Sequence, residues 1–189
     1  YVLDNNPING DLLVFNGSLL PEFNNELIKN SIALSFGKNI DIFYSDFSVN
    51  LTNDKNENIL INGGQKDEYE TIIKTLFKNL GLFDSEIPVW TNNKFDRDDI
   101  PRNISIIKSV NDFLNKISED SVKIMCIISP EELNIETRQE RFSNTLKPTD
   151  ENILKINDVI SKTDKIKHLI VTSRENSCLG WLGLDIRSF

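Results

Sequence analysis

The sequence predicts an α/β protein with a mostly parallel, Rossmann-like or flavodoxin-like sheet and helices on both faces. Short apolar runs alternate with longer amphipathic segments, as strands and crossover helices do. The run 122–128 (VKIMCII) is apolar almost throughout, which is typical of a central parallel strand covered on both faces. The following Ser129-Pro130-Glu131-Glu132 combines a Ser N-cap, an early Pro and a capping-box Glu. A helix is therefore expected to start where that strand ends.

In the first third of the chain, strands are expected at 11–17 and 39–44, joined by a helix that begins at Pro21 and ends at Gly37. Alternation in NIDIFY indicates the second strand, and Asp46 lies just past its end. The polar segment 50–58 predicts an exposed loop. The helix is indicated by apolar residues at near-helical spacing, namely Phe23, Leu27, Ile28, Ile32 and Leu34.

In the middle of the chain, a strand at 58–64 leads into a helix at 67–80, which has the most regular apolar stripe and Gly81 as its C-cap. The strand 86–90 contains Pro88, which lacks an N–H and so predicts an edge or terminal position in the sheet. A polar loop at 91–103, a short strand at 104–107 and a helix at 110–117 are expected before the central strand.

In the last third, the helix from Ser129 is expected to weaken, because 133–146 carries few apolar side chains. Another helix begins at Thr149-Asp150-Glu151, and 167–172 (KHLIVT) gives the last strand. The glycine-broken apolar segment 178–184 fits an edge strand, a packing segment or a partner surface.

Length and composition predict a single α/β domain over residues 1–189, which can be an excerpt of a longer chain. The net charge of −8 repels a phosphate backbone and argues against nucleic acid as a partner. No apolar run approaches the roughly 20 residues that span a bilayer, so no membrane partner is expected. The 2 cysteines cannot form a disulfide framework, which favours a reducing compartment and a soluble, cytoplasmic protein.

Ligands of open α/β sheets bind at the carboxyl ends of the strands, so the loops there are the places to search for chemistry. The loop 16–22 can hold an anion on its backbone N–H groups, and Asp46 can bind a ribose hydroxyl. Asn16, Gly17, Ser18 and Asp46 are therefore the candidate cofactor-binding residues. The loop has one glycine and no lysine, so neither a dinucleotide fingerprint nor a P-loop is present, and a simple turn is the competing interpretation.

Two short loops resemble those of the flavodoxin-like NADPH-dependent FMN reductases. The shared features are Gly17-Ser18 in the first loop and Pro130-Glu131 in the second. Leu20 and Phe23 stand near the positions of the family's basic residue and second hydroxyl, so the family's motif is incomplete here. The resemblance implies FMN at the first loop.

Two further groups can carry chemistry. His168, the single histidine, begins an apolar strand without a Ser or Cys motif, which favours a packing role over a catalytic triad. Asp96, Asp98 and Asp99 form a compact acidic group that can serve magnesium or calcium, although interspersed basic residues favour a solvated loop. The sequence therefore predicts no resident metal or cofactor.

The missing catalytic constellation favours a non-catalytic domain that binds protein, as a subunit or module of a larger assembly. The expected anchors are Leu179, Trp181 and Leu184, because leucine and aromatic residues commonly anchor interfaces. Burial of all three in the chain's own core would remove this surface. The alternative is a nucleotide- or flavin-binding enzyme, with FMN or a nucleotide at the loop 16–22, and metal-assisted hydrolysis at the acidic group ranks third.

Overall fold

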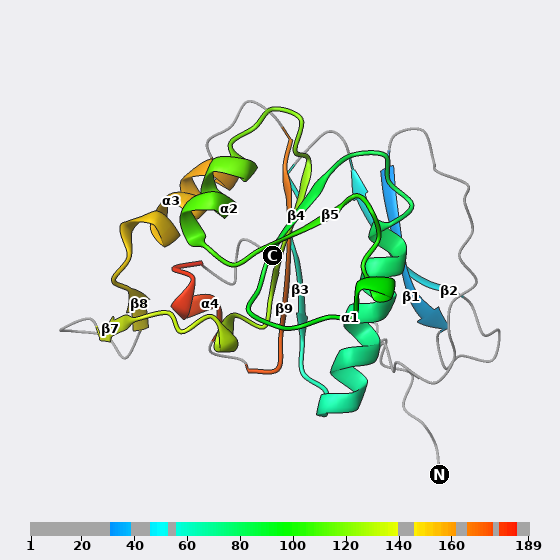
Figure 1. Cartoon of the computed structure of the whole chain (residues 1–189), viewed down its shortest axis with the longest axis horizontal. Coiled ribbons are helices and arrows are strands. Elements are labelled where there is room, and N and C mark those ends of the chain that lie inside the picture. The colour runs from blue at the N-terminus through cyan, green and yellow to red at the C-terminus, as the bar shows by residue number, and fades with distance from the viewer. Residues whose placement is uncertain are drawn as a thin grey trace, which may run out of the picture.

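The central sheet is parallel, as the sequence predicts. A computed structural model describes residues 31–38, 46–52, 56–139, 146–161, 166–175 and 178–184. Every neighbouring pair of strands in the five-stranded sheet is parallel (Figure 1). The expected strands at 11–17 and 39–44 lie outside the described residues. The order of the sheet is β3 (Ile59–Asn62), β9 (His168–Ser173), β6 (Ile124–Ile128), β4 (Ile87–Trp90) and β5 (Ile104–Ile107).

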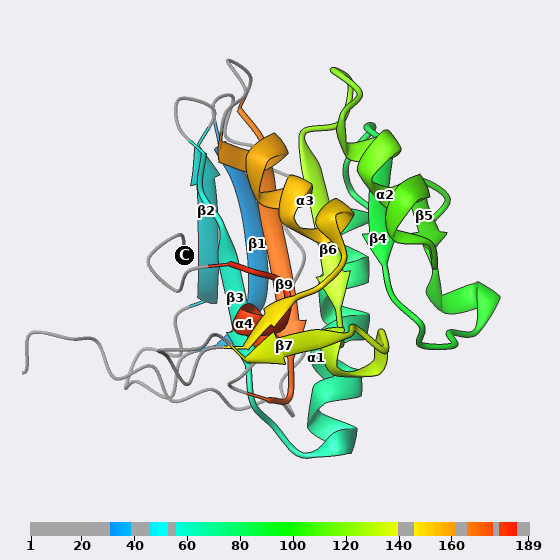
Figure 2. The same cartoon turned by 90° about the vertical axis from the view of Figure 1, so that its left-hand side faces the viewer.

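Helices cover both faces of this sheet. Helix α1 (Lys66–Leu80) lies on one face, and the hairpin of β1 (Ser31–Lys38) and β2 (Asp46–Thr52) packs beside it (Figure 1). Figure 2 shows the elements of the opposite face in front of the strands. They are α2 (Val110–Ile117), α3 (Glu151–Ser161), the short α4 (Cys178–Trp181) and the hairpin of β7 (Thr137–Gln139) and β8 (Leu146–Pro148).

Strand β6 shows why its sequence is almost continuously apolar. Successive side chains of a strand point to opposite faces of the sheet. Ile124, Cys126 and Ile128 pack in the core cluster beneath α1, whereas Met125 and Ile127 pack in the cluster beneath α2 and α3. Both sets are buried, so a polar residue at any of these positions would face a core. The predicted central position of this strand is confirmed.

The hairpin β1–β2 is joined to α1 by an amide side chain. Asn79 is buried, and its Nδ2 donates to the backbone oxygen of Ser35 at 2.8 Å while its Oδ1 accepts from the Ser35 N–H at 2.8 Å. The register of the β1–β2 pair shifts between Ser35 and Gly37. Asn79 therefore pairs the backbone at this irregularity as a neighbouring strand would.

The prediction that the helix from Pro21 continues as far as Gly37 is wrong, because residues 31–38 form strand β1. Leu34 and Phe36 are buried in the cluster beneath α1 and Ser35 between them is half-buried, which is a period of two. Ile32 lies four residues after Ile28 and Leu34 seven after Leu27, which are helical spacings, so the apolar pattern alone is ambiguous. The predicted loop at 50–58 is shorter than expected, since β2 continues to Thr52.

Strand β4 is not at the edge of the sheet, so the edge position, one of the two predicted from Pro88, is wrong. It lies between β6 and β5, and β5 is the edge strand. The N–H groups of Ile87 and Thr91 point toward β5, where they donate to Asn103 and Ile107. Pro88 therefore turns its nitrogen toward β6, and the pairing of β4 with β6 begins only at the next residue, Val89. The missing N–H lies just before the ladder and costs no hydrogen bond there.

The other predicted elements agree with the structure in part. The strand at 58–64, the helices at 67–80 and 110–117, and the strand at 167–172 are confirmed as β3, α1, α2 and β9. The helix expected from Thr149 is α3, whose start is held by Asp150 Oδ1, which accepts from the Asn152 N–H at 2.8 Å. Residues 133–146 were expected to continue a helix but contain β7 and the first residue of β8. Among the helices of the described segments, none combines the length and apolar character of a membrane span.

Candidate functional site

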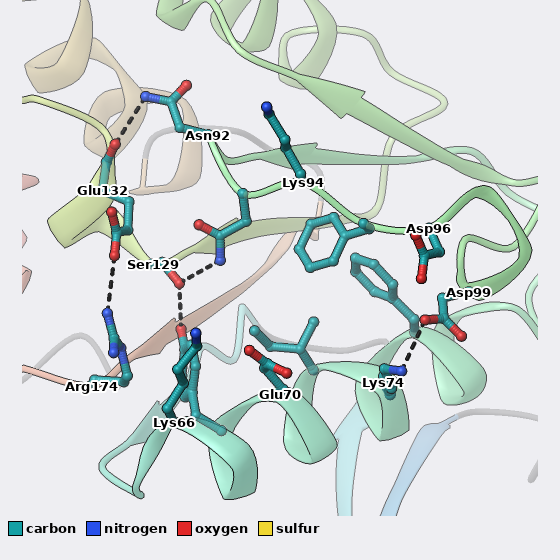
Figure 3. A pocket seen from close by; sticks show the side chains of 15 residues that line it. Lys66, Glu70, Lys74, Asn92, Lys94, Asp96, Asp99, Ser129, Glu132 and Arg174 are labelled. Atoms are coloured by element: carbon teal, nitrogen blue, oxygen red, sulfur yellow. Dashed lines mark hydrogen bonds and ion pairs between the residues drawn. The ribbon is translucent and has the colours of Figure 1, made fainter.

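A cavity of about 470 Å³ opens at the carboxyl ends of β4, β6 and β9 (Figure 3). Its volume lies within the range of sites that bind small organic ligands. Helix α1 forms one wall, and the residues that follow the three strands form the others. The lining residues are Lys66, Tyr69, Glu70, Ile73, Lys74 and Phe77 of α1, Asn92, Asn93, Lys94, Phe95, Asp96 and Asp99 after β4, Ser129 and Glu132 after β6, and Arg174 after β9.

The cavity lies between two neighbouring strands, β4 and β6, whose following segments cross to opposite faces of the sheet. After β4, Phe95 and Ile100 pack against the core cluster beneath α1, whereas after β6, Leu133 and Ile135 pack against the cluster on the other face. If β3 is counted last, the order of the sheet is the flavodoxin order 2-1-3-4-5, with its switch point between β4 and β6. This is the position where open α/β sheets bind their ligands.

Ser129 is the first residue after β6 and stands at the centre of a buried hydroxyl chain. Its backbone has φ 52° and ψ 62°, the left-handed region that non-glycine residues seldom adopt. Tyr69 Oη is 3.0 Å from Ser129 Oγ and 2.9 Å from Thr172 Oγ1, and Asn93 Nδ2 donates to Ser129 Oγ at 3.0 Å. The chain therefore joins α1, β9, β6 and the loop after β4. Unusual backbone conformations of this kind cluster at functional sites.

The expected helix at Ser129 is only a three-residue 3₁₀ turn, Pro130–Glu132. An N-cap residue has an extended backbone, whereas Ser129 is left-handed, and its side chain bonds Tyr69 instead of the following N–H groups. Glu131 accepts from Ser173 Oγ at 2.8 Å and from the Arg174 N–H at 3.1 Å. Ser129 and Glu131, which indicate a helix cap in the sequence, therefore contact α1 and the turn after β9 instead of capping a helix.

Arg174 closes one end of the cavity. Its Nη2 lies 3.0 Å from Glu132 Oε1, its Nε lies 3.6 Å from Glu131 Oε1, and its guanidinium stands 5.9 Å from the centre of the Tyr69 ring. Burial is the largest effect on the pKa of Tyr69 and raises it, so the hydroxyl keeps its proton for hydrogen bonding. The two glutamates compensate the charge of Arg174 and fix its position.

The cavity lining has as many basic as acidic side chains, but not all of them form ion pairs. Lys74 Nζ lies 3.0 Å from Asp99 Oδ2, and the pKa of Lys74 is raised first by that contact and further by the charges of Asp96 and Glu70. By contrast, Lys66 and Lys94 form no ion pair within the described part of the chain and belong to different walls. These two ammonium groups are available to an anion.

Of the sequence-predicted cofactor residues, only Asp46 lies within the described residues. Asn16, Gly17 and Ser18 lie outside the described residues. Asp46 is the first residue of β2, in the antiparallel hairpin, and therefore does not follow a strand of the parallel sheet. Helix α1, which forms a wall of the cavity, begins after β3, so this wall follows a strand other than the expected one at 11–17.

Two members of the acidic group, Asp98 and Asp99, lie in the short 3₁₀ helix η1 (Arg97–Asp99), and Asp96 directly precedes it. Asp96 and Asp99 line the cavity, while Asp98 is exposed and is not part of the lining. No group of three or more His, Cys, Asp or Glu side chains suited to a metal occurs in the segments that the structure describes. His168 lies at the other end of β9 from Arg174, with Nδ1 3.0 Å from the Glu57 backbone oxygen.

The apolar segment 178–184 forms α4 and a following turn. Leu179 and Leu184 are buried in the core cluster beneath α2 and α3, so these two expected anchors face the protein's own interior. Trp181 is half-buried. Of the three expected interface residues, only Trp181 keeps a partly accessible side chain.

Sequence reasoning missed most of the lining. Tyr69 fits the apolar stripe of the predicted helix at 67–80 and Ser129 fits a helix N-cap, so neither stands out in the sequence as a site residue. Lys66 and Lys94 carry no motif. The available signal was positional: Asn92, Asn93 and Lys94 directly follow a strand of the parallel sheet, where ligand-binding loops occur.

Comparison of the chain with models of protein families, with curated proteins and with solved structures gives no match. The class is therefore defined by the fold and the cavity alone. This is an α/β domain of the Rossmann or flavodoxin-like type, with a crevice at the carboxyl ends of its parallel strands.

Proposed function

We propose that this domain binds a small organic anion in the crevice between α1 and the loops after β4 and β6. The observation that carries the proposal is the pair Lys66 and Lys94, two cations of the cavity lining without an ion pair in the described segments, one on α1 and one in the loop after β4. A cavity at the switch point of an α/β sheet is a common ligand site. Nucleotides and FMN are the anions that fit this class of site.

The binding of FMN, NADPH, ATP and inorganic phosphate tests the proposal through the thermal unfolding midpoint. A ligand that binds only the folded protein stabilises it by about 2.7 kcal/mol at a hundred times its Kd. We expect at least one organic anion to raise the midpoint, and Lys66→Gln and Lys94→Gln to reduce the shift. Lys78→Gln is the matched control, because Lys78 lies in the last turn of α1 and does not line the cavity. If no member of the panel raises the midpoint, the proposal fails.

We also propose, as a second function, that the domain contacts a protein through a small apolar surface around α4. Leu146 and Leu154 are among the exposed large apolar side chains of the described residues, with 37% and 40% exposure. Both border α4: a Cβ at Gly183 would meet Leu154 Cδ2 at 2.9 Å, and one at Gly180 would meet the Leu146 backbone oxygen at 3.2 Å. Together with Trp181 they support the expectation of a protein partner.

Cross-linking of the natively purified protein tests this second function. The exposed Lys147 and Lys155 flank the surface, so a partner seated there is expected to give intermolecular cross-links from one or both. Leu154→Asp places a charge in the surface and is expected to abolish those cross-links. Their absence from the unmodified protein, or their persistence in the variant, argues against this partner surface.

A further inference from the structure

The two ends of the cavity differ in chemistry, which restricts the ligand further. The Ser129, Arg174 and Glu132 side chains lie at one end, and Asp96, Asp99 and Lys74 lie at the other (Figure 3). Lys66 lies on α1 beside the first end, whereas Lys94 comes from the opposite wall and its side chain points away from Lys66. A ligand that fills the cavity therefore meets the ammonium group of Lys66 near one end and, farther along, carboxylates.

The carboxylates available to a ligand are Glu70 and Asp96. Both are exposed and line the cavity, and neither forms an ion pair within the described residues, whereas Asp99 is engaged by Lys74. An ionised carboxylate only accepts hydrogen bonds, so its partner must carry O–H or N–H groups. A vicinal diol and the ring N–H or amino groups of a base are such donors, and acidic residues bind ribose hydroxyls in dinucleotide sites.

The wall between these charged groups is apolar and aromatic. Ile73, Phe77 and Phe95 line it, and the Phe77 and Phe95 rings meet edge to face, with centroids 5.1 Å apart and an interplanar angle of 67°. This contact fixes the orientation of Phe95, which is only half-buried and therefore keeps part of its ring accessible. A fixed aromatic ring beside polar groups suits a planar heteroaromatic base.

We infer that the ligand is a ribonucleoside 5′-phosphate, with its phosphate at Lys66, its sugar hydroxyls at Glu70 and its base against Phe95, within reach of Asp96. This inference rests on the proposed anion-binding function and names the class of anion. The sequence of subsites follows the connectivity of such a molecule, in which the sugar joins the phosphate to the base. Glu70 lies one helical turn after Lys66 on α1, so the phosphate and sugar subsites are neighbours on one helix.

Isothermal titration with matched probes tests the inference on the whole chain. The probes are AMP, GMP, CMP and UMP, together with the 2′-deoxy form, the nucleoside and the ribose 5-phosphate that correspond to the tightest of them. We expect removal of the phosphate, of the base or of the 2′-hydroxyl each to weaken binding, by about tenfold for the phosphate and the base and by several-fold for the hydroxyl. In Glu70→Ala the ribonucleotide and its deoxy form are expected to bind equally. Lys78→Ala is the control and is expected to keep the wild-type ratio.

The outcomes separate this inference from the proposed function. Equal binding of the ribonucleotide and its deoxy form by the wild type, or equal binding of ribose 5-phosphate and the nucleotide, overturns the inference. So does the absence of binding by all four nucleotides when FMN or NADPH still raises the midpoint through Lys66 and Lys94. Phe95→Leu keeps an apolar contact with Phe77 and is expected to weaken the nucleotide but not ribose 5-phosphate; equal weakening of both contradicts the base subsite. A failure of every anion to bind overturns the proposed function itself.

Discussion

At the scale of single residues, Tyr69 connects the core to the candidate site. Its ring is buried beneath the sheet, while its hydroxyl bonds Ser129 and Thr172 beside the cavity. One side chain therefore bonds two buried hydroxyls, Thr172 on β9 and Ser129 directly after β6, and fixes the left-handed turn at Ser129. The sequence indicates the buried ring through its helical spacing, but it gives no sign of the hydroxyl contacts.

Tyr69→Phe is expected to lower the free energy of unfolding by about 1–2 kcal/mol, because buried hydrogen-bonding groups lose a partner. Thr71→Val is the control: it removes an exposed hydroxyl from the same helix and is expected to change stability by less than about 0.5 kcal/mol. Urea unfolding at neutral pH measures both. Equal stability of Tyr69→Phe and the wild type would show that the hydroxyl chain contributes nothing.

The same tyrosine predicts a pH dependence. Burial raises the pKa of Tyr69 above its ordinary value, so the folded protein holds this proton more tightly than the unfolded chain does. The resulting stability is fully present below the ordinary tyrosine pKa of about 10 and is lost as the pH rises through the pKa of the folded state. We expect the unfolding free energy above pH 10 to fall more steeply for the wild type than for Tyr69→Phe. Parallel curves would contradict this.

At the scale of elements, α1 ends at Gly81 as predicted, but packing and not backbone conformation is the reason for the glycine. Gly81 is the C-cap, as predicted, but its φ of −65° is one that any residue adopts. Glycine is required here by a close approach: a Cβ at this position would lie 2.8 Å from Cγ and 2.9 Å from Cβ of Pro101. The helix therefore ends against the loop that precedes β5.

Gly81→Ala tests this packing. Backbone conformation alone predicts a gain of about 0.4–1 kcal/mol, since alanine restricts the unfolded chain, whereas the collision with Pro101 predicts a loss of about 1–3 kcal/mol. We expect the loss, measured by urea unfolding. The double variant Gly81→Ala/Pro101→Ala is expected to recover part of it. A stabilised Gly81→Ala variant would mean that the loop gives way without cost.

At the scale of the whole molecule, the position of each strand in the sheet determines how strongly its backbone amides are expected to be protected from hydrogen exchange. Strands β9 and β6 are covered by side chains on both faces and have strand neighbours on both sides, whereas β5 is an edge strand and β7 and β8 form a separate two-stranded pair. Amides of the central strands are expected to exchange only on global unfolding, and those of β5 and β7 faster. Hydrogen exchange followed by mass spectrometry measures this order. Slower exchange in β5 than in β6 would contradict the strand order.

Most helices and strands, and the class of fold, can be predicted from the sequence alone. The helices α1, α2 and α3 and the strands β3, β6 and β9 follow from apolar periodicity, caps and glycine stops, which depend on neighbouring residues. The same signals misassigned β1 and the turn at Ser129. A period of two overlapped a helical spacing in β1, and at Ser129 the capping side chains had stronger partners elsewhere in the fold.

The order of the strands, the interior position of β4 and the composition of the cavity depend on contacts between distant parts of the chain. These features depend on which face each connection crosses, and no short stretch of sequence encodes that choice. Lys66, Lys94 and Ser129 are far apart in the chain and meet only because parallel strands end at one edge of the sheet. The fold class was therefore readable from local patterns, whereas the site arose from contacts between distant segments.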